Sequence, residues 1–271
     1  MIARAERGLR GEIRVTEHEL PAVVARLWGH ETTSTRGPRP SLDLASIVDA
    51  ALRLADRDGL DGVTMSSVAA EVRMATMSLY RYVGSKEDLL VVMADAATPD
   101  PPPIDGRSWR SYLTDWTRAN RDFLLARPWL LGLGQHTPPL GPRTLRWLDR
   151  ALAALDGTGL GPAEGITIAT TLTGYASRQA TLTHAMTASA PAPGETIGGL
   201  VEYAEILGAV LDPSEYPMLA EAVEQNAFGT ADEWIDDADF MFGLDLLLDG
   251  IQALIGRLRP PASRTARPST W

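Results

Sequence analysis

The chain has 271 residues, of which 45% are hydrophobic and 22% are charged, a balance typical of a globular protein that can fill a core. The absence of cysteine excludes disulfide frameworks, thiolate zinc sites and cysteine nucleophiles. The formal net charge of −10 argues against non-specific nucleic-acid binding by the whole chain. Because salt screens charges that lie far apart, however, the charge near a binding surface matters more than the net charge. Because the sequence has no signal-peptide pattern and no apolar run of about 18 residues, we expect a cytoplasmic protein.

Residues 1–40 read as an N-terminal extension. Apolar side chains recur at helical spacing from Leu20 to Trp28, which predicts a short amphipathic helix over residues 18–29 with Pro21 in its first turn. The segment 30–40 is rich in Thr, Gly and Pro and is typical of a linker.

Four helices are predicted between residues 43 and 97. The first covers 43–58 and is stopped by Gly59. Thr64 caps a short second helix, and a break at 73–75 precedes a two-turn helix over 76–83. Ser85, with Asp88 three residues later, then caps a helix that reaches residue 97.

A proline-rich boundary follows at residues 98–106, where a helix cannot continue. Beyond it, further helices are predicted at 107–126, 128–135, 142–155, 163–187, 196–210, 214–226 and 232–258. We therefore expect an all-α protein: an N-terminal three-helix helix-turn-helix domain at 41–97, then a helical bundle at 107–258, and a disordered tail at 259–271.

The strongest motif lies at residues 64–90. Two short helices joined by a turn of three to four residues define a helix-turn-helix, and the small Ala69 allows the two helices to approach closely. Leu79 and Val83 hold the second helix in the core, and its outer face fits a DNA major groove. No acidic residue occurs between Val72 and Lys86, so the local charge favours this use.

This motif resembles the tetracycline-repressor (TetR) family over roughly residues 43–95. The matching positions are Thr64, Val68, Ala69, Leu79, Tyr80, Val83, Lys86, Leu89 and Leu90. The family usually has glycine in the turn, where this chain has Arg73, so we expect either a residue with positive φ there or a different turn geometry. The resemblance implies a DNA-binding transcriptional regulator, most often a repressor, with a C-terminal domain that binds a small effector.

Candidate DNA contacts follow from the outer face of the motif and its flanks. Lys86, at the start of a helix, is expected to contact phosphate, and Tyr80 is favoured over Tyr82 for a groove contact. Arg36 and Arg39 belong either to a plain linker or to an arm in the minor groove. The full set is Thr64, Ser66, Arg73, Thr76, Met77, Ser78, Tyr80, Arg81, Tyr82, Lys86, Arg36 and Arg39.

Two helices of the C-terminal part carry large apolar side chains at alternating spacings of three and four. Such a seam is either intramolecular core or a surface that pairs with a second chain. Because the corresponding helices of the TetR family form a dimer interface, the resemblance favours a homodimer. The residues assigned to it are Ile168, Leu172, Leu182, Phe240, Leu244, Leu247, Ile251 and Leu254.

The helix 107–126 carries an aromatic stripe with one polar member, Asn120, which reads either as core or as a ligand pocket. Polar and aromatic residues nearby favour a partly polar cavity for a hydrophobic or aromatic effector. The assigned residues are Trp116, Asn120, Phe123, His136, Trp147, Tyr175, Gln179 and His184. We expect no cofactor and no metal, since the histidines are scattered.

Two other classes of function are alternatives to an effector-controlled regulator. The sequence gives little support for an enzymatic function, because no metal-ligand spacing, phosphate-binding loop or nucleophile elbow is present. A constitutive or architectural DNA-binding protein without an effector stays open from the sequence alone. A thermal-shift screen against small hydrophobic compounds would separate that alternative from an effector-gated regulator.

Overall fold

The computed structural model describes residues 20–29, 43–133, 140–188, 200–228 and 237–258, and every regular element in these ranges is a helix. This confirms the expected all-α fold. The N-terminal elements are α1 (Ala22–Leu27), α2 (Leu44–Asp58), the 3-10 helix η1 (Leu60–Gly62), α3 (Met65–Glu71), α4 (Thr76–Val83) and α5 (Lys86–Ala97). The remainder are α6 (Trp109–Ala126), the 3-10 helix η2 (Pro128–Leu133), α7 (Pro142–Ala154), α8 (Pro162–Ala188), α9 (Leu200–Val210), α10 (Pro217–Glu224) and α12 (Ala238–Leu258).

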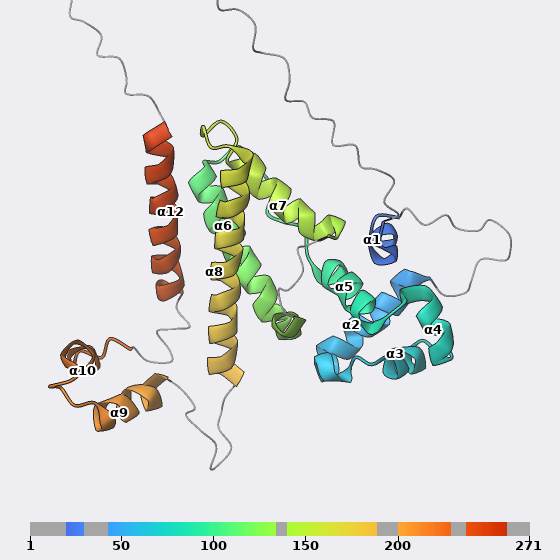
Figure 1. The fold of residues 1–271 in the computed structure, drawn as a ribbon, viewed down its shortest axis with the longest axis horizontal. Coiled ribbons are helices and arrows are strands. Elements are labelled where there is room, and N and C mark those ends of the chain that lie inside the picture. The colour runs from blue at the N-terminus through green and yellow to red at the C-terminus, as the bar shows by residue number, and fades with distance from the viewer. Residues whose placement is uncertain (1–19, 30–42, 134–139, 189–199, 229–236, 259–271) are drawn as a thin grey trace, which may run out of the picture.

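Helices α2 to α5 enclose the first of two cores. Ile47 of α2, Val68 of α3, Leu79 of α4 and Leu89 of α5 are each fully buried in it. Trp129 of η2 is also buried there, although it belongs to a later part of the chain. In Figure 1 these helices form a group to one side of α6, α7 and α8. Burial of these side chains thus fixes the positions of α3 and α4 relative to α2 and α5.

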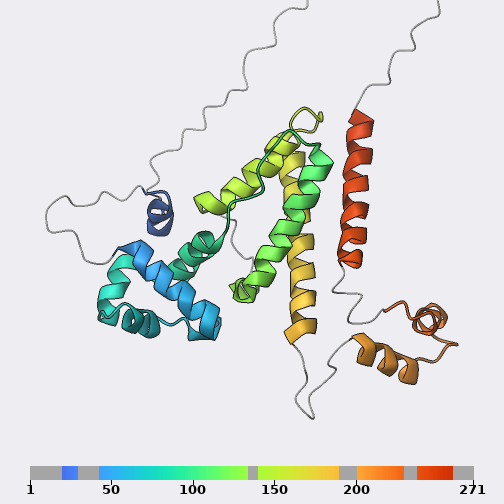
Figure 2. The same ribbon diagram turned by 180° about the vertical axis from the view of Figure 1, so that it is seen from behind.

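The second core lies between α6, α7, α8 and α12. Trp116 of α6, Leu172 of α8 and both Leu244 and Leu248 of α12 are fully buried in it. Both views show α12 running alongside this group, while α9 and α10 pack on each other beyond the ends of α8 and α12 (Figures 1 and 2). Within the described ranges, none of the helices combines the length and the hydropathy that a membrane-spanning segment requires.

Most helix boundaries agree with the sequence interpretation, and the differences have local causes. The helix expected over 18–29 is confined to α1, because Pro21 stands before its first turn with extended backbone. The helix expected at 128–135 is the 3-10 helix η2. The proposed tail at 259–271 and the beginning of the helix expected at 232 lie outside the described residues.

Candidate nucleic-acid interface and effector region

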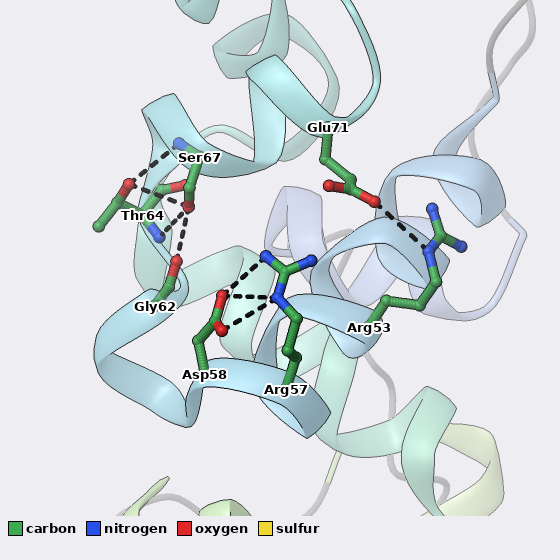
Figure 3. A network of polar contacts seen from close by, with 7 residues as sticks. All are labelled: Arg53, Arg57, Asp58, Gly62, Thr64, Ser67 and Glu71. Atoms are coloured by element: carbon green, nitrogen blue, oxygen red, sulfur yellow. Dashed lines mark hydrogen bonds and ion pairs between the residues drawn. The ribbon is translucent and has the colours of Figure 1, made fainter.

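A reciprocal cap fixes the start of α3. The Ser67 amide donates to Thr64 Oγ1 at 3.0 Å, and the Thr64 amide donates to Ser67 Oγ at 2.9 Å. Ser67 Oγ also lies 2.7 Å from the Gly62 carbonyl, so the cap joins η1 to α3 (Figure 3). A longer contact of 3.6 Å between Arg53 and Glu71 ties α2 to α3. The predicted capping role of Thr64 is confirmed.

The turn between α3 and α4 is formed by Arg73 with a φ of 55°. Its amide donates to the Ala70 carbonyl at 3.1 Å, and the Met74 amide donates to the Ala69 carbonyl at 2.9 Å. This pair of bonds is a Schellman motif, in which the left-handed position is most often glycine. Of the two alternatives left open for this turn, the positive-φ residue is therefore the one observed.

Helix α4 is anchored on one side and open on the other. Leu79 and Val83 are buried, as predicted. Met77 is 77% exposed and Tyr80 is 42% exposed, and Arg81 also lies on the outer side. Tyr82 instead packs against the first core, so Tyr80 is the better placed of the two tyrosines to reach DNA.

The flanks of α4 differ in how far they support DNA contacts. Ser66 and Arg73 are exposed, whereas Thr76, Ser78 and Lys86 are partly buried. The start of α5 carries acidic Glu87 and Asp88 beside Lys86, and the Asp88 amide is already bonded to Ser85 Oγ at 3.0 Å. A phosphate contact at Lys86 would therefore rely on the charge of its side chain more than on free backbone amides at the start of α5. Arg36 and Arg39 lie outside the described residues.

Two residues assigned to an effector pocket belong to the second core. Trp116 is 1% and Trp147 is 5% exposed, and their rings are 5.7 Å apart. The indole nitrogens donate to the carbonyls of Trp147 and Pro99 at 3.1 and 2.8 Å respectively. The assignment of Trp116 and Trp147 to an effector pocket is therefore corrected, because both side chains belong to the second core.

The other residues assigned to the effector pocket are less deeply buried. Asn120, Phe123, Gln179 and His184 are partly buried on α6 and α8. Tyr175 Oη donates to the Phe240 carbonyl at 2.8 Å and receives a bond from Gln179 Nε2 at 3.3 Å. Burial raises the pKa of the Tyr175 hydroxyl above its ordinary value. His136 lies outside the described residues.

A groove of about 530 Å³ opens beside the first core, and Phe123 of α6 lines it. Asp56 of α2 accepts a hydrogen bond from Trp129 Nε1 at 2.7 Å and lies 3.3 Å from Arg127 Nε. The remaining lining residues are Ala97, Pro99, Ala126 and Pro128. The sequence interpretation missed this groove, because Asp56 and Trp129 are 73 positions apart and no motif relates them.

The sequence interpretation also missed a buried cation on α6. Arg121 is 7% exposed, its guanidinium lies 4.1 Å from the Phe240 ring centroid, and Nη1 contacts Asp237 at 2.6 Å. Burial opposes its charge, but the bonds to Asp237 and Asp122 outweigh burial and raise the pKa of Arg121 above its ordinary value. Arg121 thus joins α6 to the start of α12.

The apolar seam assigned to a dimer interface lies largely inside one chain. Its members Ile168, Leu172, Phe240, Leu244 and Ile251 are 0 to 9% exposed and pack in the second core. This corrects their assignment, because side chains already buried within one chain offer no surface to another. The remaining members, Leu182, Leu247 and Leu254, are partly buried.

A different face of α12 is open. Phe242 is 69% and Leu246 is 59% exposed, and the two residues are one helical turn apart. Large apolar side chains this exposed and adjacent form a surface on which a partner could be buried.

No group of acidic or histidine side chains suited to a metal ion occurs among the described residues.

Comparison with known proteins agrees with this geometry. Residues 47–93 match the model of bacterial regulatory proteins of the tetR family, and residues 102–255 match the tetracyclin repressor-like C-terminal domain. The HTH-type transcriptional repressor DrrR1 of Streptomyces coeruleorubidus is 32% identical over 249 residues, which cover 86% of each chain.

Solved structures show the same fold. ActR from Streptomyces coelicolor, crystallised without ligand, has a TM-score of 0.66 at 23% identity, covering 82% of this chain and all of that one. A possible TetR family regulator from Streptomyces coelicolor A3(2) has a TM-score of 0.60 at 27% identity, covering 78% of this chain and 98% of that one. The chain therefore belongs to the tetR family of bacterial regulatory proteins, and is a DNA-binding transcriptional regulator rather than an enzyme.

Proposed function

We propose that this regulator represses transcription by binding a pseudo-palindromic operator as a homodimer, and that a small, mostly apolar effector releases it. The observation that carries the proposal is α4, which is anchored by two buried residues and presents Met77, Tyr80 and Arg81 outward. The relative DrrR1 is described as a repressor, which favours repression over activation. A protein that acts on bacterial operators works in the cytoplasm.

The geometry supports major-groove binding by α4. An exposed helix about 12 Å in outer diameter fits the major groove, which is about 12 Å wide. Tyr80 and Met77 would contact base edges, while Arg73, Arg81 and Lys86 would contact phosphates. Thr64 works through its cap, which fixes α3 behind the recognition helix. Residues 41–97 thus form the DNA-binding unit.

Two such units are needed to read two half-sites, and we place the dimer contact on the open face of α12. Complete burial of Phe242 and of Leu246 against a partner would each contribute about 1.5–3 kcal/mol to the free energy of dimerisation. In an isolated chain both side chains remain exposed to water. Residues 107–258 would thereby serve both dimerisation and effector binding. The homodimer holds two copies of α4 about one helical turn of DNA apart.

We place the effector in the groove lined by Phe123, Trp129, Asp56 and Arg127. Its volume of about 530 Å³ lies in the range of small-molecule sites, and its walls combine aromatic rings with one carboxylate and one guanidinium. A ligand there touches α2 of the DNA-binding unit and α6 of the bundle together. It would therefore favour one relative orientation of the two parts, as release by population shift requires.

The experiment is the selection of a binding duplex from a random-sequence pool, followed by affinity measurements at several salt concentrations. Lys86→Ala should weaken binding to all sequences alike and reduce the salt slope by about one. Arg257→Ala removes an equal charge from the far end of α12 and serves as the matched control. A wild-type protein that selects no duplex would contradict the proposed function.

Effector control is tested separately with planar aromatic compounds. Actinorhodin, with which ActR was crystallised, and minocycline, found with a TetR variant from Acinetobacter baumannii, are suitable first compounds. A compound that binds in the groove should quench Trp129 fluorescence and lower operator affinity, and operator DNA must lower its affinity by the same factor. A compound that binds tightly without changing operator affinity would contradict placement of the effector site at this groove.

A further inference from the structure

The start of α7 is capped by a side chain from the DNA-binding unit. Asp95, near the end of α5, is 6% exposed. Its Oδ1 accepts hydrogen bonds from the Arg143 amide at 3.1 Å, the Thr144 amide at 2.9 Å and Thr144 Oγ1 at 2.9 Å. The partners are 48 and 49 positions away in sequence, so the cap joins two distant segments.

Helix α7 has no cap of its own. The N-cap position is Gly141, which has no side chain, and Pro142 at the first helical position has no amide hydrogen. The next two amides, of Arg143 and Thr144, both donate to Asp95. The first turn of α7 therefore satisfies its amides through α5.

Glycine at position 141 is required for this arrangement. A Cβ atom built there would lie 2.1 Å from Asp95 Oδ1 and 2.7 Å from Asp95 Cβ, far inside contact distance. The carboxylate thus occupies the space that a side chain at the N-cap would fill. Gly141 is itself buried.

Asp95 is also rigidly connected to the recognition helix. Leu89, Val92, Met93 and Ala97 of α5 are all buried in the first core, together with Leu79 of α4. A rotation of the DNA-binding unit therefore carries Asp95 with it. Since the cap depends on a carboxylate within 3.1 Å of two amides, such a rotation strains or breaks it.

We propose that Asp95 is the positioning residue that couples the orientation of the DNA-binding unit to α7. This inference rests on the proposed function and adds the contact through which the bundle senses the operator-bound state. Other contacts hold the same junction, among them Trp28 Nε1 to the Leu140 carbonyl at 2.9 Å and Arg143 Nη1 to the Thr98 carbonyl at 3.3 Å. Asp95 differs from these contacts because its carboxylate accepts hydrogen bonds from the amides of the first turn of α7.

The test is amide hydrogen exchange in the full-length protein, read at residues 143 and 144, with and without the duplex that the wild type selects. In the free protein, Asp95→Ala should accelerate exchange at these amides about five- to tenfold, as loss of a cap does. Asp95→Asn should retain most of the protection, since Asn caps about as well as Asp. Because duplex binding sets the orientation of the DNA-binding unit, it should change exchange there several-fold in the wild type and in Asp95→Asn, but not in Asp95→Ala.

Ser108→Ala is the matched control, because Ser108 caps α6 through the Ser111 amide within its own segment. It should accelerate exchange at residue 111 and leave the duplex response at 143 and 144 intact. If Asp95→Ala does not fold, Gly141→Ala tests the contact from the α7 side, and it should show the same two losses.

The inference is overturned if Asp95→Ala leaves exchange at these amides unchanged, or if it keeps the duplex-dependent change of the wild type. It is also overturned if the wild type binds a duplex tightly without any change at 143 and 144. Absence of duplex binding by the wild type is a different result, detected in the selection itself, and it contradicts the proposed function instead.

Discussion

Replacing Arg73 by glycine should stabilise the DNA-binding unit while weakening its hold on DNA. Arg73 has a φ of 55°, a conformation that costs a residue with a Cβ roughly 1–2 kcal/mol. Glycine removes this cost but raises the entropy of the unfolded chain by roughly 0.5–1 kcal/mol. The net gain is therefore about 0–1.5 kcal/mol, with both Schellman hydrogen bonds retained, since they involve only main-chain atoms.

The assay is urea unfolding followed by far-ultraviolet circular dichroism, with Arg73→Ala and Arg73→Asn as controls. Alanine keeps the Cβ and should gain nothing, whereas asparagine tolerates the left-handed region and should fall between the two. Each variant lacks the same positive charge, so each should reduce the salt slope of DNA binding by about one if Arg73 contacts phosphate. A glycine variant no more stable than the alanine variant would refute this reasoning.

Three further changes test separate parts of the structure. Thr64→Ala should cost about 1 kcal/mol of stability, measured by urea unfolding, because it removes the side-chain acceptor of the α3 cap; no loss would mean that the cap contributes little. Leu246→Asp should give folded monomers by light scattering, whereas Leu244→Asp should prevent folding because Leu244 is fully buried; a dimeric Leu246→Asp would contradict the proposed interface. Phe123→Ala should weaken binding of a planar aromatic effector while leaving operator binding near normal, because Phe123 lines the groove, and unchanged effector affinity in titrations would remove Phe123 from the site.

Local signals predicted the DNA-binding unit well. The bounds of α4 were obtained residue for residue, because Gly84 stops the helix with a φ of 71° and the preceding turn interrupts the apolar pattern. The caps by Thr64 and Ser85 involve partners three residues away and are therefore readable in the sequence. At Arg73 the sequence left two alternatives open, a positive φ or a different turn geometry, and the structure shows the positive φ.

Contacts between distant segments could not be predicted in the same way. The spacing of three and four in α12 indicates which side chains are buried, but it does not tell whether the partner is the same chain or a copy. For Leu244 the partner proved to be the same chain. Asp95 likewise looked like an ordinary residue of a helix, because nothing near it in sequence shows that α7 lacks a cap.

Recognition of DNA sequence by α4 can be measured as a ratio of two affinities. The affinity for the selected duplex is divided by the affinity for a scrambled duplex, for Tyr80→Ala and for Tyr216→Ala. Tyr216 lies on the segment before α10 and is 52% exposed, against 42% for Tyr80, so it controls for loss of an exposed tyrosine. We expect Tyr80→Ala to lower this ratio at least tenfold, about 1.4 kcal/mol, and Tyr216→Ala to leave it unchanged. Equal ratios in the wild type and both variants would contradict the placement of Tyr80, and with it the assignment of α4 as the recognition helix.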